Sequence, residues 1–268
     1  MAEKGVRTIP KAVRELCRGF PGAEEFESHG SPNYRAREGA RKGKVFAVFA
    51  LNHHGDGRVA LWLNTPALEQ SRLLAASRHL FKPPYVGPSG WIGVELNAGV
   101  SWKFVRELAY MAYVHSSPPK LVARIAKPPV AAAPTVKMKP ADIDRMLAPK
   151  AQKALRLLRE ICKSLPETHE GTQTGSVVWR TGKRSFLSLY DYGKGLTASF
   201  WVGIERQGPL EMDPRFEIPA YSGPNGWIAF DMTRSTTQRE LREFVVDSFL
   251  HFATRRAAAA LEATNLVA

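Results

Sequence analysis

An internal repeat constrains this 268-residue chain more than any other feature of its sequence. Residues 15–35 align with residues 160–180 at a constant offset of 145, and residues 85–92 align with residues 221–228 at an offset of 136. Because order and register hold along both copies, the repeat predicts a tandem duplication of one module. Matching pairs are Glu15/Glu160, Cys17/Cys162, Pro21/Pro166, Glu25/Glu170, Gly30/Gly175, Ser31/Ser176, Arg35/Arg180, Arg106/Arg242 and His115/His251.

Between these two matches, Gly43-Lys44 aligns with Gly182-Lys183 at an offset of 139. This alignment predicts six extra residues in the first copy, inserted after Arg35.

The repeat divides the chain into a first module (1–125), a connector (126–150) and a second module (151–268). The connector holds five prolines and an alanine run, which favours a semi-rigid, extended segment of roughly 3.1 Å per residue. Such a connector allows the copies to pack as a pseudo-dimer or to remain apart, and the sequence leaves both arrangements open.

Hydrophobic periodicity predicts a similar series of elements in each copy. The first copy has helical spacing over 11–19, β-rich runs over 45–51, 58–63 and 90–96, and a helix over 65–79. In the second copy, Gly208, Pro209 and Pro214 predict a short or broken helix within 204–216. Ser101 is expected to cap the last helix of copy one, and Thr237 with Glu240 fits a capping box in copy two, where the helix is expected to continue through Arg255-Arg256. The fold class is therefore α+β, with the order α-β-β-β-α-β-α in each copy and an antiparallel sheet.

Composition limits the kind of protein. Hydrophobic residues make up 44% and charged residues 24%, as in a globular chain. Two cysteines, one in each copy, exclude a disulfide-stapled scaffold. The longest apolar run, 45–51, is far short of the roughly 20 residues that cross a membrane. No apolar run begins the chain, so we expect a cytoplasmic protein with no membrane association.

The positive charge is unevenly distributed. The net charge is +13, of which residues 1–125 carry +8, residues 126–150 carry +3 and residues 151–268 carry +2. This asymmetry favours a polyanionic partner, although a solvated basic surface would look the same at this level.

Four segments together carry a family resemblance: Leu16–Glu25, Gly43–Ala47, Gly90–Leu96 and the helix start Ser101-Trp102. Their order resembles the MmcQ/YjbR-like family over nearly all of both copies. The resemblance implies a fold similar to frataxin-like and secretion-chaperone-like α+β domains, and members are often described as DNA-binding through a double-wing shape. It supplies no catalytic residue.

A basic hairpin is the main candidate site. Five cations lie within ten residues of copy one, where Lys and Arg could displace the counterions of a phosphate backbone. A solvated hairpin tip is the alternative. The candidate nucleic-acid-binding residues are Arg35, Arg37, Arg41, Lys42 and Lys44, with Arg180, Lys183 and Arg184 in copy two.

The other conspicuous residues favour structural roles. The matched aromatics Tyr85/Tyr221 and Trp91/Trp227 are expected in the core. His53-His54 with Asp56 is interpreted as a turn, because no second ligand group has zinc-like spacing. His115 and His251 lack an identifiable acid partner. Cys17 and Cys162 are expected to be buried and unreactive. No phosphate-binding glycine loop is present, and the pattern predicts no catalytic residue, metal or cofactor.

The leading hypothesis is a non-enzymatic protein that binds nucleic acid, DNA in particular, with modest affinity through the basic hairpin. One alternative is a protein- or peptide-interaction module that uses a groove between the copies or an exposed sheet edge. Another is a binder of small ligands or an enzyme whose site is assembled from scattered residues.

Overall fold

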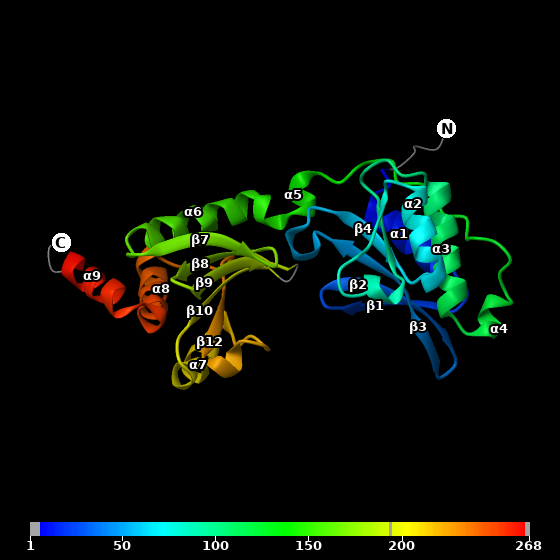
Figure 1. Cartoon of the computed structure of the whole chain (residues 1–268). Helices are drawn as coiled ribbons and strands as arrows, with labels where there is room; N and C mark the ends of the chain where they lie inside the picture. The colour runs from blue at the N-terminus through cyan, green and yellow to red at the C-terminus, as the bar shows by residue number, and fades with distance from the viewer. Residues whose placement is uncertain (1–5, 193–194, 266–268) are drawn as a thin grey trace. The chain divides into compact units, whose positions relative to one another are not determined.

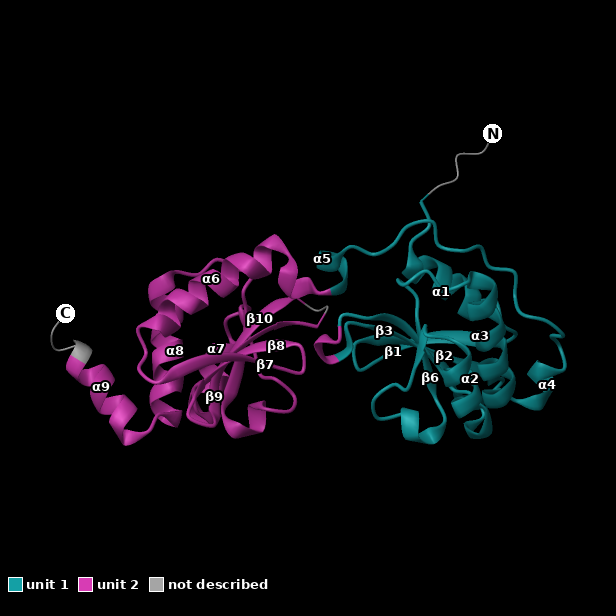
Figure 2. Cartoon of the chain, turned by 45° about the horizontal axis from the view of Figure 1, so that its top comes forward, with its two compact units in different colours: residues 1–53, 57–143 teal, residues 54–56, 144–268 magenta. Residues whose placement is uncertain are grey.

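The computed structural model describes residues 6–192 and 195–265, which form two compact units (Figures 1 and 2). The first unit comprises residues 6–53 and 57–143. The second comprises residues 54–56, 144–192 and 195–265.

Each unit is built on one six-stranded antiparallel sheet with the same topology. The strand order is β1-β2-β3-β4-β6-β5 in the first unit and β7-β8-β9-β10-β12-β11 in the second. The strands of the first unit are β1 (Ala23–Ser28), β2 (Ser31–Glu38), β3 (Arg41–Leu51), β4 (Val59–Leu63), β5 (Leu80–Phe81) and β6 (Ile92–Glu95). Those of the second are β7 (Thr168–Gln173), β8 (Ser176–Thr181), β9 (Arg184–Asp191), β10 (Leu196–Trp201), β11 (Phe216–Glu217) and β12 (Trp227–Asp231).

Helices lie against one face of each sheet, which places the main core between the two layers (Figure 1). The helices of the first unit are α1 (Ile9–Arg18), α2 (Gln70–Ala76), α3 (Trp102–Ser116), α4 (Pro119–Val122) and α5 (Pro140–Ile143). Those of the second are α6 (Pro149–Lys163), α7 (Ile204–Glu211), α8 (Gln238–Phe252) and α9 (Arg255–Asn265). Short 3-10 turns cover 53–55, 67–69, 87–89, 145–147 and 223–225.

Aromatic side chains join helix and sheet in the first unit. Phe20 stacks on Tyr113 with ring centroids 4.5 Å apart, and Phe46 meets Tyr113 edge-on at 5.6 Å. All three rings are at most 2% exposed. Burial of such side chains contributes about 1.5–3 kcal/mol each, so the α3–β3 contact is a main source of stability in this unit.

The structure confirms the α+β class and adds two strands to each predicted module. Strands β1 and β5, and their counterparts β7 and β11, were not predicted from the sequence. The β1 sequence holds three glutamates, which have low strand propensity. It forms a strand because it lies at the sheet edge, where charged side chains reach solvent and discourage pairing with another chain.

The predicted helix over 65–79 is shorter than expected. The Thr65 hydroxyl donates to the carbonyl of Gly90 at 2.8 Å instead of capping a helix, and α2 covers only 70–76. The short helix expected within 204–216 is confirmed in the second unit, where α7 has eight residues and contains Pro209. Proline removes one N–H donor there, and the helix ends two residues later.

Helix caps were predicted with mixed success. Thr237 accepts a hydrogen bond from the Glu240 amide at 3.1 Å, which confirms the N-cap of α8. Ser101 occupies the N-cap of α3 without a side-chain capping bond. The predicted continuation through Arg255-Arg256 is wrong, because Ala253 is extended and Thr254 caps a separate helix, α9.

The C-terminal extension of the first unit is fastened to its helices. Trp102 Nε1 donates to the Ala131 carbonyl at 3.0 Å, and Arg106 Nε donates to the Pro129 carbonyl at 2.8 Å. The Asn97 side chain makes two hydrogen bonds to the Met138 backbone, at 2.9 and 3.1 Å. The proline-rich segment thus lies along the first unit for most of its length. A cavity of about 230 Å³ lies beneath it, between residues 96–102 and 133–137. Over the described part of the chain, no helix has the length and apolarity needed to span a membrane.

Candidate nucleic-acid interface

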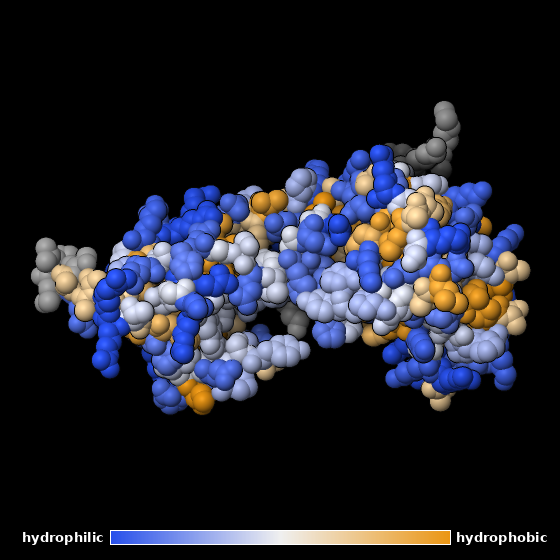
Figure 3. All heavy atoms as spheres, viewed as in Figure 1, coloured by the Kyte–Doolittle hydropathy of each residue, from blue (hydrophilic) through white to orange (hydrophobic). Residues whose placement is uncertain are grey.

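The β2–β3 hairpin carries all five cations predicted in the first module. Glu38 pairs with Arg41 across the two-residue turn Gly39-Ala40, and Gly39 adopts the left-handed φ of 54° that a tight turn requires. Arg37 pairs with Lys42, so their side chains emerge on the same face. In Figure 1 the end of this hairpin projects from the first unit, and in Figure 3 it is largely hydrophilic.

The register corrects the sequence alignment of the hairpin. Gly182 is the turn residue of β8–β9, with a φ of 56°, so its counterpart is Gly39 and not Gly43. Nine residues separate the paired Arg35 and Val45, whereas four separate the equivalent Arg180 and Ser185. The extra length is an extension of the hairpin itself, and this extension carries Arg37, Arg41, Lys42 and Lys44.

Two of the five cations share one carboxylate of strand β1 as an ion-pair partner. Arg35 Nε lies 2.5 Å from Glu24, and Arg37 Nη1 lies 3.6 Å from the same side chain. The hydrogen bond from Arg35 holds the pKa of Glu24 below its usual value, so the carboxylate stays charged. Arg35 also lies over the Phe26 ring at 4.2 Å, which fixes its guanidinium on the sheet.

The other three cations are available to a ligand. Arg41, Lys42 and Lys44 are exposed. Within the described residues, no ion pair involves any of them. Exposed cations without a carboxylate partner keep their full charge for an incoming phosphate.

Helix α4 adds a cation that the sequence pattern did not identify. Lys120 is 86% exposed, and its Nζ lies 4.0 Å from Glu38 of the hairpin. The Pro118-Pro119 break turns the chain back toward the hairpin, and a Cβ added at Gly43 would lie 3.1 Å from Pro118. The break itself was visible in the sequence, but the residue it brings to the hairpin was not.

The second unit presents a smaller basic hairpin. Arg180 donates to Gln173 at 2.7 Å, and Lys183 and Arg184 are exposed at the turn. The three cations predicted there thus lie on one hairpin, although Arg180 is held against the edge strand.

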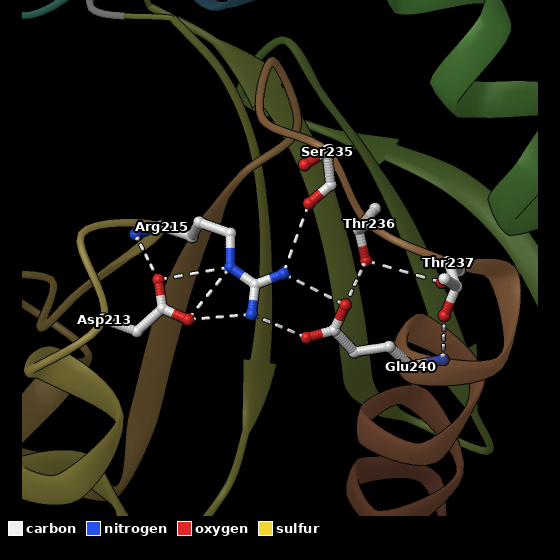
Figure 4. Close-up of polar contacts among 6 residues, drawn as sticks. All are labelled: Asp213, Arg215, Ser235, Thr236, Thr237 and Glu240. Atoms are coloured by element: carbon white, nitrogen blue, oxygen red, sulfur yellow. Dashed lines mark hydrogen bonds and ion pairs between the residues drawn. The ribbon is translucent and has the colours of Figure 1, made fainter.

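A polar cluster in the second unit is a structural link (Figure 4). The Arg215 guanidinium donates to Asp213 at 2.7 Å and to Glu240 at 2.8 Å, joining the segment before β11 to the start of α8. Hydrogen bonds from Arg215 lower the pKa of both carboxyls. Glu240 therefore serves the ion pair and accepts a hydrogen bond from the Thr236 hydroxyl at 2.8 Å, and a backbone hydrogen bond from Thr237 contributes to its lowered pKa, as in a capping box.

The tyrosines expected in the core are on the surface. Tyr85 is 74% exposed and Tyr221 is 91% exposed, while Trp91 and Trp227 are half-buried. Both tyrosines begin short turns that end in a left-handed glycine, Gly90 or Gly226. Their match between copies therefore reflects loop geometry and not core packing.

The remaining candidates, the cysteines and histidines, lie in packed or turn positions. Cys17 and Cys162 are buried as predicted, and burial raises the pKa of both thiols, that of Cys162 to about 12. His53 starts a 3-10 turn, and His251 stacks on Trp201 at 3.5 Å. No group of three or more His, Cys, Asp or Glu side chains in the described ranges is arranged to hold a metal ion.

Comparison with known proteins agrees with the family resemblance in the first copy. The family model described as YjbR matches residues 18–115. The first unit is thus similar to the YjbR family over these residues. The crystal structure of the Deinococcus radiodurans protein DR2400, which has a DUF419 domain, is similar over 39% of this chain and 85% of its own, with 19% identity and a TM-score of 0.34. No curated protein matches the chain.

Proposed function

We propose that this protein binds nucleic acid through the β2–β3 hairpin of its first module, as a binding protein and not as an enzyme. One observation carries the proposal: Arg41, Lys42 and Lys44 are exposed and have no carboxylate partner among residues 6–192 and 195–265, and they lie on an extension that the second hairpin lacks. A cation paired with a carboxylate gains little from a phosphate, whereas a solvated cation releases counterions when it binds one.

The duplicated architecture also supports this division of roles. We infer that the two modules arose by duplication, since they share strand order and helix placement. The hairpin of the first module is longer than that of the second and carries more positive charge. The concentration of positive charge in residues 1–125 is consistent with this specialisation.

Fluorescence anisotropy with labelled DNA across a salt series tests the proposal. The variant R41A/K42A/K44A should lower the affinity for every sequence and reduce the slope of log affinity against log salt by about 3 for duplex DNA. The control K150A/K153A/R156A removes the same charge from the exposed side of α6.

The comparison of the two variants decides the outcome. Equal losses in both would show that only net charge matters. An unchanged slope in the hairpin variant would remove the hairpin as the site, and would turn attention to a protein or peptide partner.

A further inference from the structure

We propose that strand β7 is a self-association surface, at which two copies of the chain pair edge to edge in antiparallel register and join their sheets. This inference is independent of the basic hairpin and of the proposed function. Three observations on the second unit carry it. The backbone edge of β7 is open, its side chains are exposed, and it has fewer glutamates than the matching edge of the first unit.

The backbone of β7 has hydrogen-bonding groups that β8 does not use. β7 is the last strand of its sheet and is joined to β8 by the turn Thr174-Gly175, whose φ values of 48° and 82° are those of a type I′ hairpin. Gln173 and Ser176 therefore exchange the hydrogen bonds that close the turn, and such pairs alternate along the ladder. The residues whose N–H and C=O groups point away from β8 are Thr168, Glu170 and Thr172.

This edge is accessible. Outside the β7–β8 ladder, no backbone hydrogen bond within residues 6–192 and 195–265 involves residues 168–173. An edge strand with unpaired backbone groups is a template for pairing with another chain. Four of the six residues of β7 are exposed, namely His169, Glu170, Thr172 and Gln173.

The matching edge of the first unit is protected against such pairing. Strand β1 holds three glutamates, whereas β7 holds one. The offset of 145 that relates the two copies here places Glu27 at the position of Thr172, and Phe26 at the position of Gly171. β1 is also less open, because only Glu27 of its six residues is exposed. The two edges thus differ in charge and in exposure, in the direction that favours pairing at β7.

Symmetry and charge fix the register of the proposed pair. Hydrogen-bonded and non-hydrogen-bonded pairs alternate in an antiparallel ladder, so a two-fold axis must pass through a residue that faces its own copy. In a strand of six residues, Glu170 and Gly171 are the centres that give the longest overlap. A centre at Glu170 sets two glutamates directly opposite each other, which is destabilising. A centre at Gly171 sets each Glu170 opposite Thr172 of the second copy, and no like charges meet.

The register centred on Gly171 also uses the open backbone groups. Glu170 and Thr172 both turn their N–H and C=O groups to the open edge, and they lie opposite each other twice in the pair. Gly171 meets its own copy with no side chains between the two backbones. His169 lies opposite Gln173, so the exposed side chains pair without a charge conflict.

The same arrangement is unfavourable at β1. A centre at Phe26, the counterpart of Gly171, sets Glu25 opposite Glu27 at two places. Like charges directly opposite each other destabilise a strand pair. The proposed pairing is therefore specific to β7. It is a small interface, so the dimer is weak and reversible.

Sedimentation of the full chain from about 10 to 500 µM measures this association. We expect the weight-average mass to rise with concentration from that of one chain toward that of two. Thr172→Glu gives β7 the charge that β1 has at this position, and should raise the dissociation constant by about tenfold, because the two-fold axis makes the repulsion occur twice. Gln238→Glu adds the same charge at the exposed start of α8 and should leave the association unchanged.

Cross-linking through an introduced cysteine tests the register. In the proposed pair the two Gly171 Cα atoms would be about 4.5–5.5 Å apart, which is within the range of a disulfide. Oxidised Gly171→Cys should therefore run as a covalent dimer on a non-reducing gel. Gln173→Cys is the control, because the two copies of residue 173 would be roughly 13 Å apart along the pair. Both native cysteines are buried, so they contribute no cross-link.

Thermal unfolding checks that each variant is folded. An added Cβ at Gly171 meets only the flexible end of the Arg180 side chain, at 3.0 Å. If Gly171→Cys is nevertheless unfolded, Thr172→Glu decides the matter, because β1 already carries a glutamate at this position.

Two results would overturn the inference. The first is a chain that stays monomeric over the whole concentration range, which would leave the open edge to an extended peptide. The second is a dimer that Thr172→Glu does not weaken, or that Gln173→Cys cross-links as efficiently as Gly171→Cys, since another surface would then form the contact. Neither result bears on the hairpin, whose DNA binding is measured separately.

Discussion

Arg14 on helix α1 and Glu25 on strand β1 form a bidentate ion pair, with Nε–Oε2 and Nη2–Oε1 distances of 2.8 and 2.7 Å. The second unit repeats it between Arg159 and Glu170, at 2.8 and 2.6 Å. In both units this pair ties the first helix to the edge strand, and Cys17 or Cys162 lies on the buried side of the same helix. The repeat is therefore preserved as an interaction between side chains, and not only as a sequence pattern.

Loss of this pair should destabilise each unit modestly. The arginines are 58% and 44% exposed, so solvent screens the attraction. In a double-mutant cycle with Arg159→Leu and Glu170→Leu, we expect a coupling free energy of about 0.5–1 kcal/mol by urea unfolding. A cycle in which the two substitutions are additive would show that the pair contributes no stability.

A close contact between β5 and β6 predicts a larger loss of stability than removal of the ion pair does. A Cβ at Gly93 would lie 2.3 Å from the Phe81 ring. Only glycine therefore allows this ring to pack against the backbone of strand β6. Gly93→Ala should destabilise the first unit by about 1–3 kcal/mol. The added variant Phe81→Ala should relieve most of this cost, and Ala229, the equivalent residue of the second unit, already has a Cβ. Equal destabilisation with and without Phe81 would contradict the clash.

The Arg215 cluster predicts a pH dependence of stability. The pKa values of Asp213 and Glu240 are lowered in the folded protein, from usual values of 3.8 and 4.5. Their contribution is therefore complete above the unfolded values and is lost as pH falls through the folded ones.

Thermal unfolding from pH 7 to pH 3 should show the second unit losing stability below about pH 4.5. Arg215→Met should be less stable at pH 7 and should show a shallower loss toward acid. Parallel pH profiles for the two proteins would mean that Arg215 does not set these pKa values.

Thiol chemistry should be slow in the native protein. Both cysteines are buried, and their raised pKa values keep the thiols protonated at neutral pH. Ellman's reagent at pH 8 should modify neither cysteine until denaturant is added, when both should react. Rapid modification of Cys17 or Cys162 in folded protein would show that helix α1 or α6 opens readily.

Elements whose signals are local could be predicted from the amino-acid sequence. The helix α1 and the strands β3, β4 and β6 follow from periodicity within short windows, and the repeat that relates the modules follows from the aligned residues. The presence of the basic residues also follows from the sequence, because charge is a property of composition.

Which of these residues come together depends on the three-dimensional fold. It set the hairpin register that matches Gly39 with Gly182, paired Glu24 with two of the predicted cations and brought Lys120 to the hairpin. It also placed Tyr85 on the surface. These relationships depend on pairing between strands distant in sequence, and local propensity contains no information about the pairing register.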